Sequence, residues 1–558
     1  MEKIWLNNYP KNVKHTVDIH LFSSLSDLFL KSAEQFSTLP AVECLGVTLT
    51  YQELKIKVEA FSAYLQSQGF KKGDRLAIML PNCIQYMITL FGAFLAGLTV
   101  VNINPLYSER ELHHQLQDSG ATSIVVLANV AHTLAKVAPE LNLSHIIVTE
   151  MGDLHPWPKS TIINFVLRRI KKTIPPYQFK HAINFLNIIK KKNKKAFKPV
   201  ELTHQDIAFL QYTGGTTGIA KGAVLTHGNM VANIEQAYAW LEDHLRVGKE
   251  RVGVLLPLYH VFSLLTNAFI FTRIGSLNVL IPNPRDTEMV IKSFKTHRFT
   301  VLMVVNTLLN NLLNKEEFRQ LDFSDLHVVI AGGMALQKAI AERWKEVTGM
   351  AVCEGFGLTE ASPIVSVNPI HQQDYKGSIG LPVPMTDIKI INEEEEELPL
   401  GEVGELCIAG PQVMQAYWNN PEETKKVLTT DGWLKTGDMA RLDEEGFIYI
   451  VDRKKDMIDV AGFNVYPNEI ENVLVQHPKV SEAVVIGVPH RVTGEAVKAY
   501  VVRNNDTLTK GELMAYCRQH MVSYKVPRRI EFCKELPKNN VGKVLRRLLK
   551  EQATEAIS

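Results

Sequence analysis

The sequence has few of the features that mark secreted, zinc-binding or hydrolytic proteins. Its six cysteines are scattered over 558 residues without a CxxC pair, which argues against a disulfide framework or a zinc site and favours reduced thiols in a cytoplasmic protein. No HExxH or GxSxG motif is present, so the common patterns of metalloproteases and esterases are missing. The opening residues, MEKIWLNNYPKN, lack the apolar run of a signal peptide, and we expect no secretion.

One long stretch, residues 76–108, contains no charged side chain. Pro81 and Asn82 fit the start of a helix, Gly97 fits its end, and the following VVNINP fits a buried strand. The helix between these signals has about 15 residues, fewer than the roughly 20 that cross a bilayer. The stretch therefore predicts a buried helix followed by a parallel strand, and no transmembrane segment.

Basic residues are concentrated in one segment. The net formal charge is only +2, which argues against a general nucleic-acid binder. Residues 159–200 nevertheless contain twelve Lys or Arg and no Asp or Glu. Between 159 and 198 these cations alternate with Phe, Ile and Leu, as in an amphipathic helix lying on an anionic membrane. We expect peripheral contact with the inner face of the cell membrane, with a solvated loop as the alternative.

Alternating strand and helix patterns predict an α/β fold in the first two thirds of the chain. Helical patterns such as 109–120 and 336–349 alternate with apolar runs that read as strands, which implies parallel sheets covered by helices. These strands are expected at 75–80, 98–103, 123–127, 145–149, 301–305 and 327–333. After about residue 376 the runs 378–384, 386–391, 404–410 and 446–451 predict a smaller antiparallel β unit. From about residue 453 helices and strands mix in an α+β segment.

The strongest local motif is YTGGTTGIAKGAVLTH, residues 212–227. Its glycines permit tight turns with exposed N–H groups, its threonines add hydroxyl donors and Lys221 adds positive charge, so the segment can enclose a polyphosphate. It is not a Walker A loop, because Ala220 precedes the lysine and Gly222 follows it where Ser or Thr would be required.

Further motifs follow in a fixed order: EGFGLTE (354–360), TGD (436–438), VDRKKDMI (451–458), GFNVYP (462–467) and PKNNVGKVLRR (537–547). Because it contains these motifs in this order, the chain resembles the adenylate-forming, or AMP-binding, superfamily. That superfamily includes acyl-CoA synthetases, luciferases and peptide-synthetase adenylation domains. From Trp5 to about Lys550 it is most similar to bacterial long-chain fatty-acid–CoA ligases.

The resemblance implies a domain organisation. A large adenylation domain would span residues 1–452, with helix-covered parallel sheets and a small β-barrel unit at about 376–452. A small mobile α+β lid domain would span 453–558 and swing about a hinge at Asp452. The same resemblance implies a role in fatty-acid degradation and a homodimer.

Site residues follow from the same resemblance. Lys543, Glu360 and Thr359 would be catalytic, Thr216 and Glu360 would hold Mg²⁺, and His260, Gly462 and Phe463 would contact the acyl group or coenzyme A. The residues expected to contact ATP are Tyr212, Thr213, Gly214, Gly215, Thr216, Thr217, Gly218, Ile219, Ala220, Lys221, Gly222, Ala223, Gly333, Gly355, Phe356, Gly357, Asp438 and Arg453.

These residue types suit the implied chemistry. A carboxylate that attacks the α-phosphate of ATP brings two anions together, and a mobile lysine and a Glu-bound Mg²⁺ supply positive charge where the transition state needs it. An ionised carboxylate such as Asp438 can accept hydrogen bonds from both hydroxyls of a ribose. The implied reaction converts a fatty acid, ATP and coenzyme A into acyl-CoA, AMP and pyrophosphate through an acyl-adenylate.

The acyl substrate is expected to be a hydrocarbon chain. Residues 252–272 contain no charge, and Phe262 and Ser263 stand where amino-acid-activating relatives place an Asp. An apolar wall suits a fatty acid, since burial contributes about 0.8 kcal/mol per CH₂. The alternatives are an acyl-AMP ligase, an aryl- or medium-chain acyl-CoA ligase, or an inactive lipid- or nucleotide-binding protein.

Overall fold

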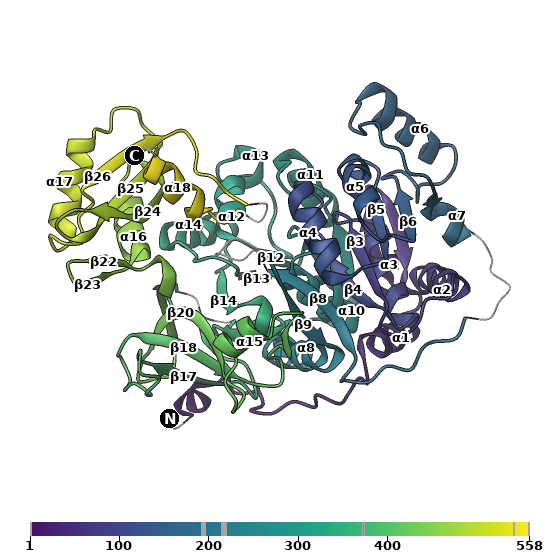
Figure 1. The fold of residues 1–558 in the computed structure, drawn as a ribbon, viewed down its shortest axis with the longest axis horizontal. Helices are drawn as coiled ribbons and strands as arrows, with labels where there is room; N and C mark the ends of the chain where they lie inside the picture. Colours follow the sequence, from purple (N-terminus) through teal and green to yellow (C-terminus); the bar gives the residue numbers. More distant parts are fainter. Residues whose placement is uncertain are drawn as a thin grey trace.

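The computed structural model describes residues 3–190, 197–213, 220–370, 372, 374–539 and 542–555. The predicted ATP contacts Gly214, Gly215, Thr216, Thr217, Gly218 and Ile219 lie outside the described residues. The chain has an α/β body with two large sheets, a small β unit beside it at the lower left, and a C-terminal α+β unit above that β unit (Figure 1). This is the predicted fold class.

An eight-stranded sheet carries the start of the phosphate-loop motif. In spatial order, the neighbouring strands from β8 to β7 pair in parallel. The central strands β3, β4 and β5 are almost wholly buried, which fits a sheet covered on both faces. The strands predicted at 75–80, 98–103, 123–127 and 145–149 are confirmed as four of the parallel strands. In spatial order the strands are β19 (Ala416–Tyr417), β9 (Lys221–Thr226), β8 (Ile207–Thr213), β4 (Thr99–Asn102), β3 (Arg75–Met79), β5 (Ser123–Leu127), β6 (His145–Thr149) and β7 (Ala182–Asn184).

A nine-stranded sheet lies beside the first. The strands predicted at 301–305 and 327–333 are confirmed as β12 and β13. The segment 378–384 was expected in the small β unit, but it forms β16 at the edge of this sheet, because Leu381 and Pro382 pair with β15 and are buried there. The order is β16 (Leu381–Pro382), β15 (Ile364–Val367), β14 (Cys353–Gly357), β13 (Val328–Ala331), β12 (Val301–Val304), β10 (Arg251–Val254), β11 (Leu277–Leu280), β1 (Pro40–Cys44) and β2 (Val47–Thr50).

The uncharged stretch forms a buried helix, as predicted. All residues of α3 (Ile84–Leu95) are buried, and Phe91 stacks on Phe29 with 4.2 Å between ring centroids. Among the described residues, no helix combines the length and the hydrophobicity that a membrane crossing requires. The predicted helices at 109–120 and 336–349 are confirmed as α4 (Glu109–Ser119) and α14 (Lys338–Thr348), each ended by a glycine in the left-handed region.

The other described α-helices before residue 452 cover the two sheets or connect their strands. They are α1 (Leu25–Gln35), α2 (Tyr51–Ser67), α5 (Ala131–Val137), α6 (Lys159–Phe165), α7 (Phe185–Lys190), α8 (His227–Leu241), α9 (Val261–Ser263), α10 (Phe271–Arg273), α11 (Thr287–His297), α12 (Asn306–Leu313), α13 (Glu316–Arg319) and α15 (Pro421–Val427).

The small β unit that the sequence predicts takes the form of a four-stranded antiparallel sheet. Its outer strand β21 pairs at Ile448 with Gly380, next to β16, so the unit is joined to the nine-stranded sheet. The strand order is β17 (Asp387–Ile391), β18 (Gly404–Ala409), β20 (Leu434–Leu442) and β21 (Ile448–Arg453).

The C-terminal segment has its own apolar cores, built from residues 458–553, whereas the main core of the preceding chain ends at Ile448. This separation supports, as a proposal, the expected boundary between residues 452 and 453. The elements are β22 (Ile458–Val460), β23 (Phe463–Val465), α16 (Pro467–Gln476), β24 (Val480–His490), β25 (Gly494–Arg503), α17 (Lys510–His520), β26 (Arg529–Cys533) and α18 (Arg546–Glu555).

Because Gly380 lies close to β15, we predict that alanine at this position destabilises the fold more than alanine at a glycine with open space around it. A Cβ atom at Gly380 would overlap the carbonyl carbon of Val367, and the φ of Gly380 is +92°. We expect Gly380→Ala to destabilise the fold by about 3 kcal/mol, through steric overlap added to backbone strain. Gly46 has a φ of +83°, but a Cβ atom there would have no neighbouring atom within 4 Å, so Gly46→Ala carries strain alone, about 1 kcal/mol. Thermal unfolding midpoints compare the two variants, and equal shifts would contradict the prediction.

Candidate active site

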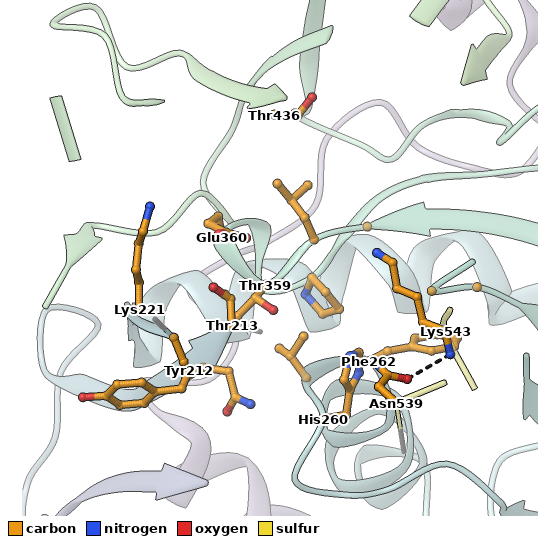
Figure 2. A pocket seen from close by; sticks show the side chains of 18 of the residues that line it. Tyr212, Thr213, Lys221, His260, Phe262, Thr359, Glu360, Thr436, Asn539 and Lys543 are labelled. Carbon is orange, nitrogen blue, oxygen red and sulfur yellow. Dashed lines mark hydrogen bonds between the residues drawn. The ribbon is translucent and has the colours of Figure 1, made fainter. Parts of the chain in front are cut away.

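A cavity of about 1540 Å³ lies between the large body and the C-terminal unit. Figure 2 shows it from close by, with Lys221 on one side of Thr359 and Glu360 and Lys543 on the other. The structure thus brings together residues that are more than three hundred positions apart in the chain. The predicted site residues that line the cavity are Tyr212, Thr213, Ala220, Lys221, His260, Gly333, Gly355, Phe356, Gly357, Thr359, Glu360, Arg453 and Lys543.

Strand pairing fixes the two ends of the predicted phosphate loop. β8 ends at Thr213 and β9 begins at Lys221, and these two residues are paired across the antiparallel ladder. A Cβ atom at Gly222 would lie 3.1 Å from the ring of Tyr212, so a larger residue would push that ring. On α4, His114 Nε2 lies 3.1 Å from the carbonyl oxygen of Ala220, which adds a contact at the end of the loop.

The ammonium of Lys221 is held by a carboxylate. It forms an ion pair with Glu423 on α15, and the same carboxylate lies 2.5 Å from Nζ of Lys426. The hydrogen bond from Lys221, followed by that from Lys426, lowers the pKa of Glu423 to about 2. The Lys221 ammonium also lies 5.3 Å from the ring centroid of Tyr417. Lys221 is therefore positioned by two residues of the segment that includes β19 and α15.

Thr359 and Glu360 lie on a short 3₁₀ turn, η6 (Thr359–Ala361), directly after β14. The hydroxyl of Tyr417 donates a hydrogen bond of 2.6 Å to Glu360 Oε1. The backbone N–H of Met414 donates to the Glu360 carbonyl oxygen at 2.7 Å. Both the main chain and the side chain of Glu360 are thus tied to residues 414–417.

Asp438 and Arg453 are paired residues on the neighbouring strands β20 and β21. Arg453 Nε lies 2.8 Å from Asp438 Oδ1. Asp438 is 2 % exposed, and burial raises the pKa of its carboxyl group. Within the part of the chain that the structure describes, its Oδ2 is buried without a hydrogen-bond partner. A buried acceptor of this kind suits a hydroxyl donor from a ligand.

Lys543 of the C-terminal unit lines the cavity, and its main chain bonds to Asn539. Asn539 N donates to the Lys543 carbonyl oxygen at 2.8 Å, and Lys543 N donates to Asn539 Oδ1 at 2.9 Å. A Cβ atom at Gly542 would overlap Thr307 Oγ1, so glycine at this position allows the main chain to approach α12 this closely. Burial, reinforced by the charge of Arg453, lowers the pKa of the Lys543 ammonium to about 8.

The predicted acyl wall is buried and apolar. Residues 252–272 form β10, α9, the π-helical turn η5 (Leu264–Ile270) and α10, and Phe262 and Thr266 from this stretch line the cavity. Burial, followed by the charge of Lys543, lowers the pKa of His260 to about 4, so its imidazole is neutral at pH 7. Further apolar lining residues include Ala237, Trp240, Leu241, Met303, Val305, Ile330, Ile364 and Val367.

Five of the predicted site residues lie elsewhere. Gly222 and Asp438 lie next to lining residues, and Ala223 is fully buried in β9. Phe463 lines a separate cavity of about 270 Å³ in the C-terminal unit, where it stacks on Tyr524 with 4.7 Å between ring centroids. Gly462, also assigned to the acyl or coenzyme A contact, precedes Phe463 on this face. The structure therefore does not bring the predicted coenzyme A residues to the main cavity.

The motifs did not reveal Tyr417, Glu423 or His114. The sequence NNPEET does carry a helix-start signature, with Asn420 as the N-cap, Pro421 at the first helical position and acidic residues in the first turn. That signature predicts a helix but not its contact with Lys221, because the two segments are 202 positions apart.

Comparison with known proteins agrees with this geometry. The chain is 50% identical over 554 residues to a long-chain-fatty-acid–CoA ligase of Escherichia coli, and the match covers 99% of both chains. It is 39% identical over 559 residues to a long-chain-fatty-acid–CoA ligase of Bacillus subtilis, and this match also covers 99% of both chains. ATP-bound MatB from Rhodopseudomonas palustris superimposes with a TM-score of 0.83 at 26% identity, covering 96% of this chain and 100% of that one. The o-succinylbenzoate CoA synthetase of Bacillus subtilis, in complex with its acyl-adenylate, gives 0.76 at 28% identity, with 94% and 97% covered.

Two sequence-family models cover most of the chain. The AMP-binding enzyme family matches residues 29–418, and the AMP-binding enzyme C-terminal domain matches residues 469–543. The first match ends at Trp418, just after Tyr417, which contacts both Lys221 and Glu360, and the second ends at Lys543 itself. The chain belongs to the AMP-binding enzyme family.

Proposed function

We propose that this protein ligates a long-chain fatty acid to coenzyme A, with ATP consumed through an acyl-adenylate. The observation that carries the proposal is the convergence of Lys221, Glu360 and Lys543 on one cavity that continues along an uncharged apolar wall. The relatives named as long-chain-fatty-acid–CoA ligases, matched over nearly the full chain, support the same substrate class.

In the first half-reaction, the carboxylate of the fatty acid attacks the α-phosphate of ATP and pyrophosphate leaves. Both reactants are anions, so fixed positive charge lowers the barrier. Lys543 supplies one such charge at the cavity, and Lys221, next to the predicted phosphate loop, supplies another. Glu360 has the oxygen ligands that Mg²⁺ prefers, and a bound Mg²⁺ would neutralise phosphate charge.

The nucleoside would be held on the side of β14 and β20. Phe356 on β14 lines the cavity with the flat apolar surface that an adenine ring requires. The unpartnered Oδ2 of buried Asp438 provides an acceptor for a ribose hydroxyl, while Oδ1 stays paired with Arg453. The cavity therefore offers contacts for the base and the ribose, in addition to the lysines that face the phosphates.

For the thioester-forming step, we propose that the C-terminal unit turns so that Gly462 and Phe463 meet coenzyme A. The hinge is proposed at Asp452, whose buried carboxylate accepts hydrogen bonds from Arg453 N at 2.7 Å and Asn468 N at 2.8 Å. These bonds link the end of β21 to the start of α16, so a rotation here would exchange them.

We also propose that residues 157–172 contact an anionic membrane from the cytoplasmic side. Here α6 continues into the π-helical turn η3 (Val166–Ile170), and its apolar side chains face outward: Trp157, Ile162, Phe165 and Ile170 are 83%, 57%, 57% and 66% exposed. Arg169, Lys171 and Lys172 are exposed beside them. Aromatic and aliphatic side chains flanked by cations are the composition of an interfacial helix.

The surface proposed here covers less of the chain than the segment 159–198 predicted from the sequence. Phe185, Ile188 and Ile189 of α7 are buried, and Phe185 contacts Phe61 of α2 with 5.5 Å between ring centroids. These apolar residues of the predicted segment 159–198 therefore face the protein core. The homodimer implied by the family resemblance stays a prediction.

The first test of the ligase is palmitate-dependent exchange of pyrophosphate into ATP. We expect exchange in the wild type and a loss of about 10²–10³-fold in Lys543→Ala. The pKa of about 8 in the free enzyme predicts that kcat/KM for exchange falls as pH rises through 8, because the ammonium loses its proton. Lys543→Arg should remove this alkaline limb, since a guanidinium stays charged.

Absence of wild-type exchange would favour a binding protein over a ligase. Exchange without acyl-CoA formation when coenzyme A is added would favour an acyl-AMP ligase. An alkaline limb that persists unchanged in Lys543→Arg would show that another group titrates.

Trp240 is expected to limit the acyl chain length. It lines the cavity, is 2% exposed, and is fixed by a 3.0 Å hydrogen bond from its Nε1 to the carbonyl oxygen of Asn368. Trp240→Ala should raise the ratio of stearate to laurate kcat/KM about tenfold, because space for two more methylenes is worth about 1.6 kcal/mol. Ala237→Leu, on the same face, should lower that ratio. Trp344→Ala, which removes a buried tryptophan outside the cavity, serves as the control, and an unchanged ratio in Trp240→Ala would refute the assignment.

Membrane contact is tested by sedimentation with vesicles of equal parts phosphatidylglycerol and phosphatidylcholine. Phe165→Ser together with Ile170→Ser should lower the partition coefficient about tenfold, because two apolar side chains lose their place in the interface. Ile56→Ser, at an equally exposed apolar residue on α2, should change it little. Equal sedimentation of the double variant and the wild type would argue against this surface.

A further inference from the structure

Residues 414–418 form a short edge segment that was not part of any predicted site. β19 pairs with β9 through Ala416 and Val224 and through Tyr417 and Ala223. The N–H of Trp418 donates to the Gly222 carbonyl oxygen at 2.7 Å, directly beside the end of the phosphate loop. The segment is therefore attached to the strand that begins at Lys221.

The side chain of Tyr417 lies between two charged groups of opposite sign. Its hydroxyl donates a 2.6 Å hydrogen bond to Glu360 Oε1, and its ring centroid lies 5.3 Å from the ammonium of Lys221. Tyr417 is 8% exposed and lines the same cavity as both partners.

We propose that Tyr417 is a positioning residue for Glu360 and Lys221 in the adenylation step; the inference rests on the proposed function. A glutamate side chain has several rotamers, and the Tyr417 hydroxyl selects one by engaging Oε1, which leaves Oε2 for a cation. The ring face gives the Lys221 ammonium a second favourable contact besides Glu423. Partners of this kind orient the groups that bind metals and phosphates, and their loss typically lowers metal affinity or activity about 10–100-fold.

A purely structural tyrosine would behave differently. Tyr51 is also buried and donates through its hydroxyl to the Ser276 carbonyl oxygen at 2.9 Å, but it does not line the cavity. Removing its hydroxyl would lower stability without any effect on the dependence of the reaction on Mg²⁺. The two tyrosines therefore form a matched pair for a test.

The test compares Tyr417→Phe with Tyr51→Phe in the full-length protein. Tyr417→Phe should raise the Mg²⁺ concentration for half-maximal palmitate-dependent exchange about tenfold, whereas Tyr51→Phe should leave it unchanged. Tyr417→Leu, which also removes the ring, should in addition raise the KM for ATP, because Lys221 loses a contact. Thermal unfolding midpoints establish that all variants are folded. A Mg²⁺ dependence of Tyr417→Phe that superimposes on the wild type would overturn the inference.

Calorimetric titration with ATP, in the presence and absence of Mg²⁺, keeps this inference separate from the ligase proposal. If the wild type shows no exchange, the ligase proposal fails, and the titration still decides the role of Tyr417. The gain in ATP affinity that Mg²⁺ provides should be about tenfold smaller in Tyr417→Phe than in the wild type. An equal gain in both proteins would overturn the role.

Discussion

Hydrogen bonding along both edges of β9 organises the candidate site. On one edge β8 pairs with β9 so that Thr213 and Lys221 meet at the mouth of the phosphate loop. On the other edge β19 adds the segment that contacts Glu360 through the Met414 N–H and the Tyr417 hydroxyl. If either pairing slipped by one residue, side chains would change faces of the sheet and these contacts would be lost.

Charge in the cavity is arranged in compensated sets. Lys221 is paired with Glu423, and Arg453 with Asp438, so the cations are held in place by anions of the protein itself. Lys543 differs, because burial and neighbouring positive charge lower its pKa to about 8. A bound triphosphate would bring further negative charge close to this lysine and favour its charged form, which is why such a cation suits an anion-binding site.

The fold was largely predictable where local pattern decides the outcome. The buried parallel strands and α3 are continuous apolar runs with clear turn signals, and the structure places their limits at most three residues from the predicted ones. The errors occurred where a segment joins a distant partner. Residues 378–384 were assigned to the small β unit but pair with β15, and the apolar residues of α7 pack on α2 although their basic neighbours suggested a membrane surface.

The sequence by itself determined the chemical groups of the site and the family to which the chain belongs, because residue types in ordered motifs can be read without coordinates. Only the tertiary structure decided which groups meet. Tyr417 and Glu360 are 57 positions apart, and Lys221 and Glu423 are 202 positions apart, so no local spacing relates them. Their contacts arise from strand pairing and from the packing of α15. These depend on the free energy of the whole folded chain, and no single segment encodes them.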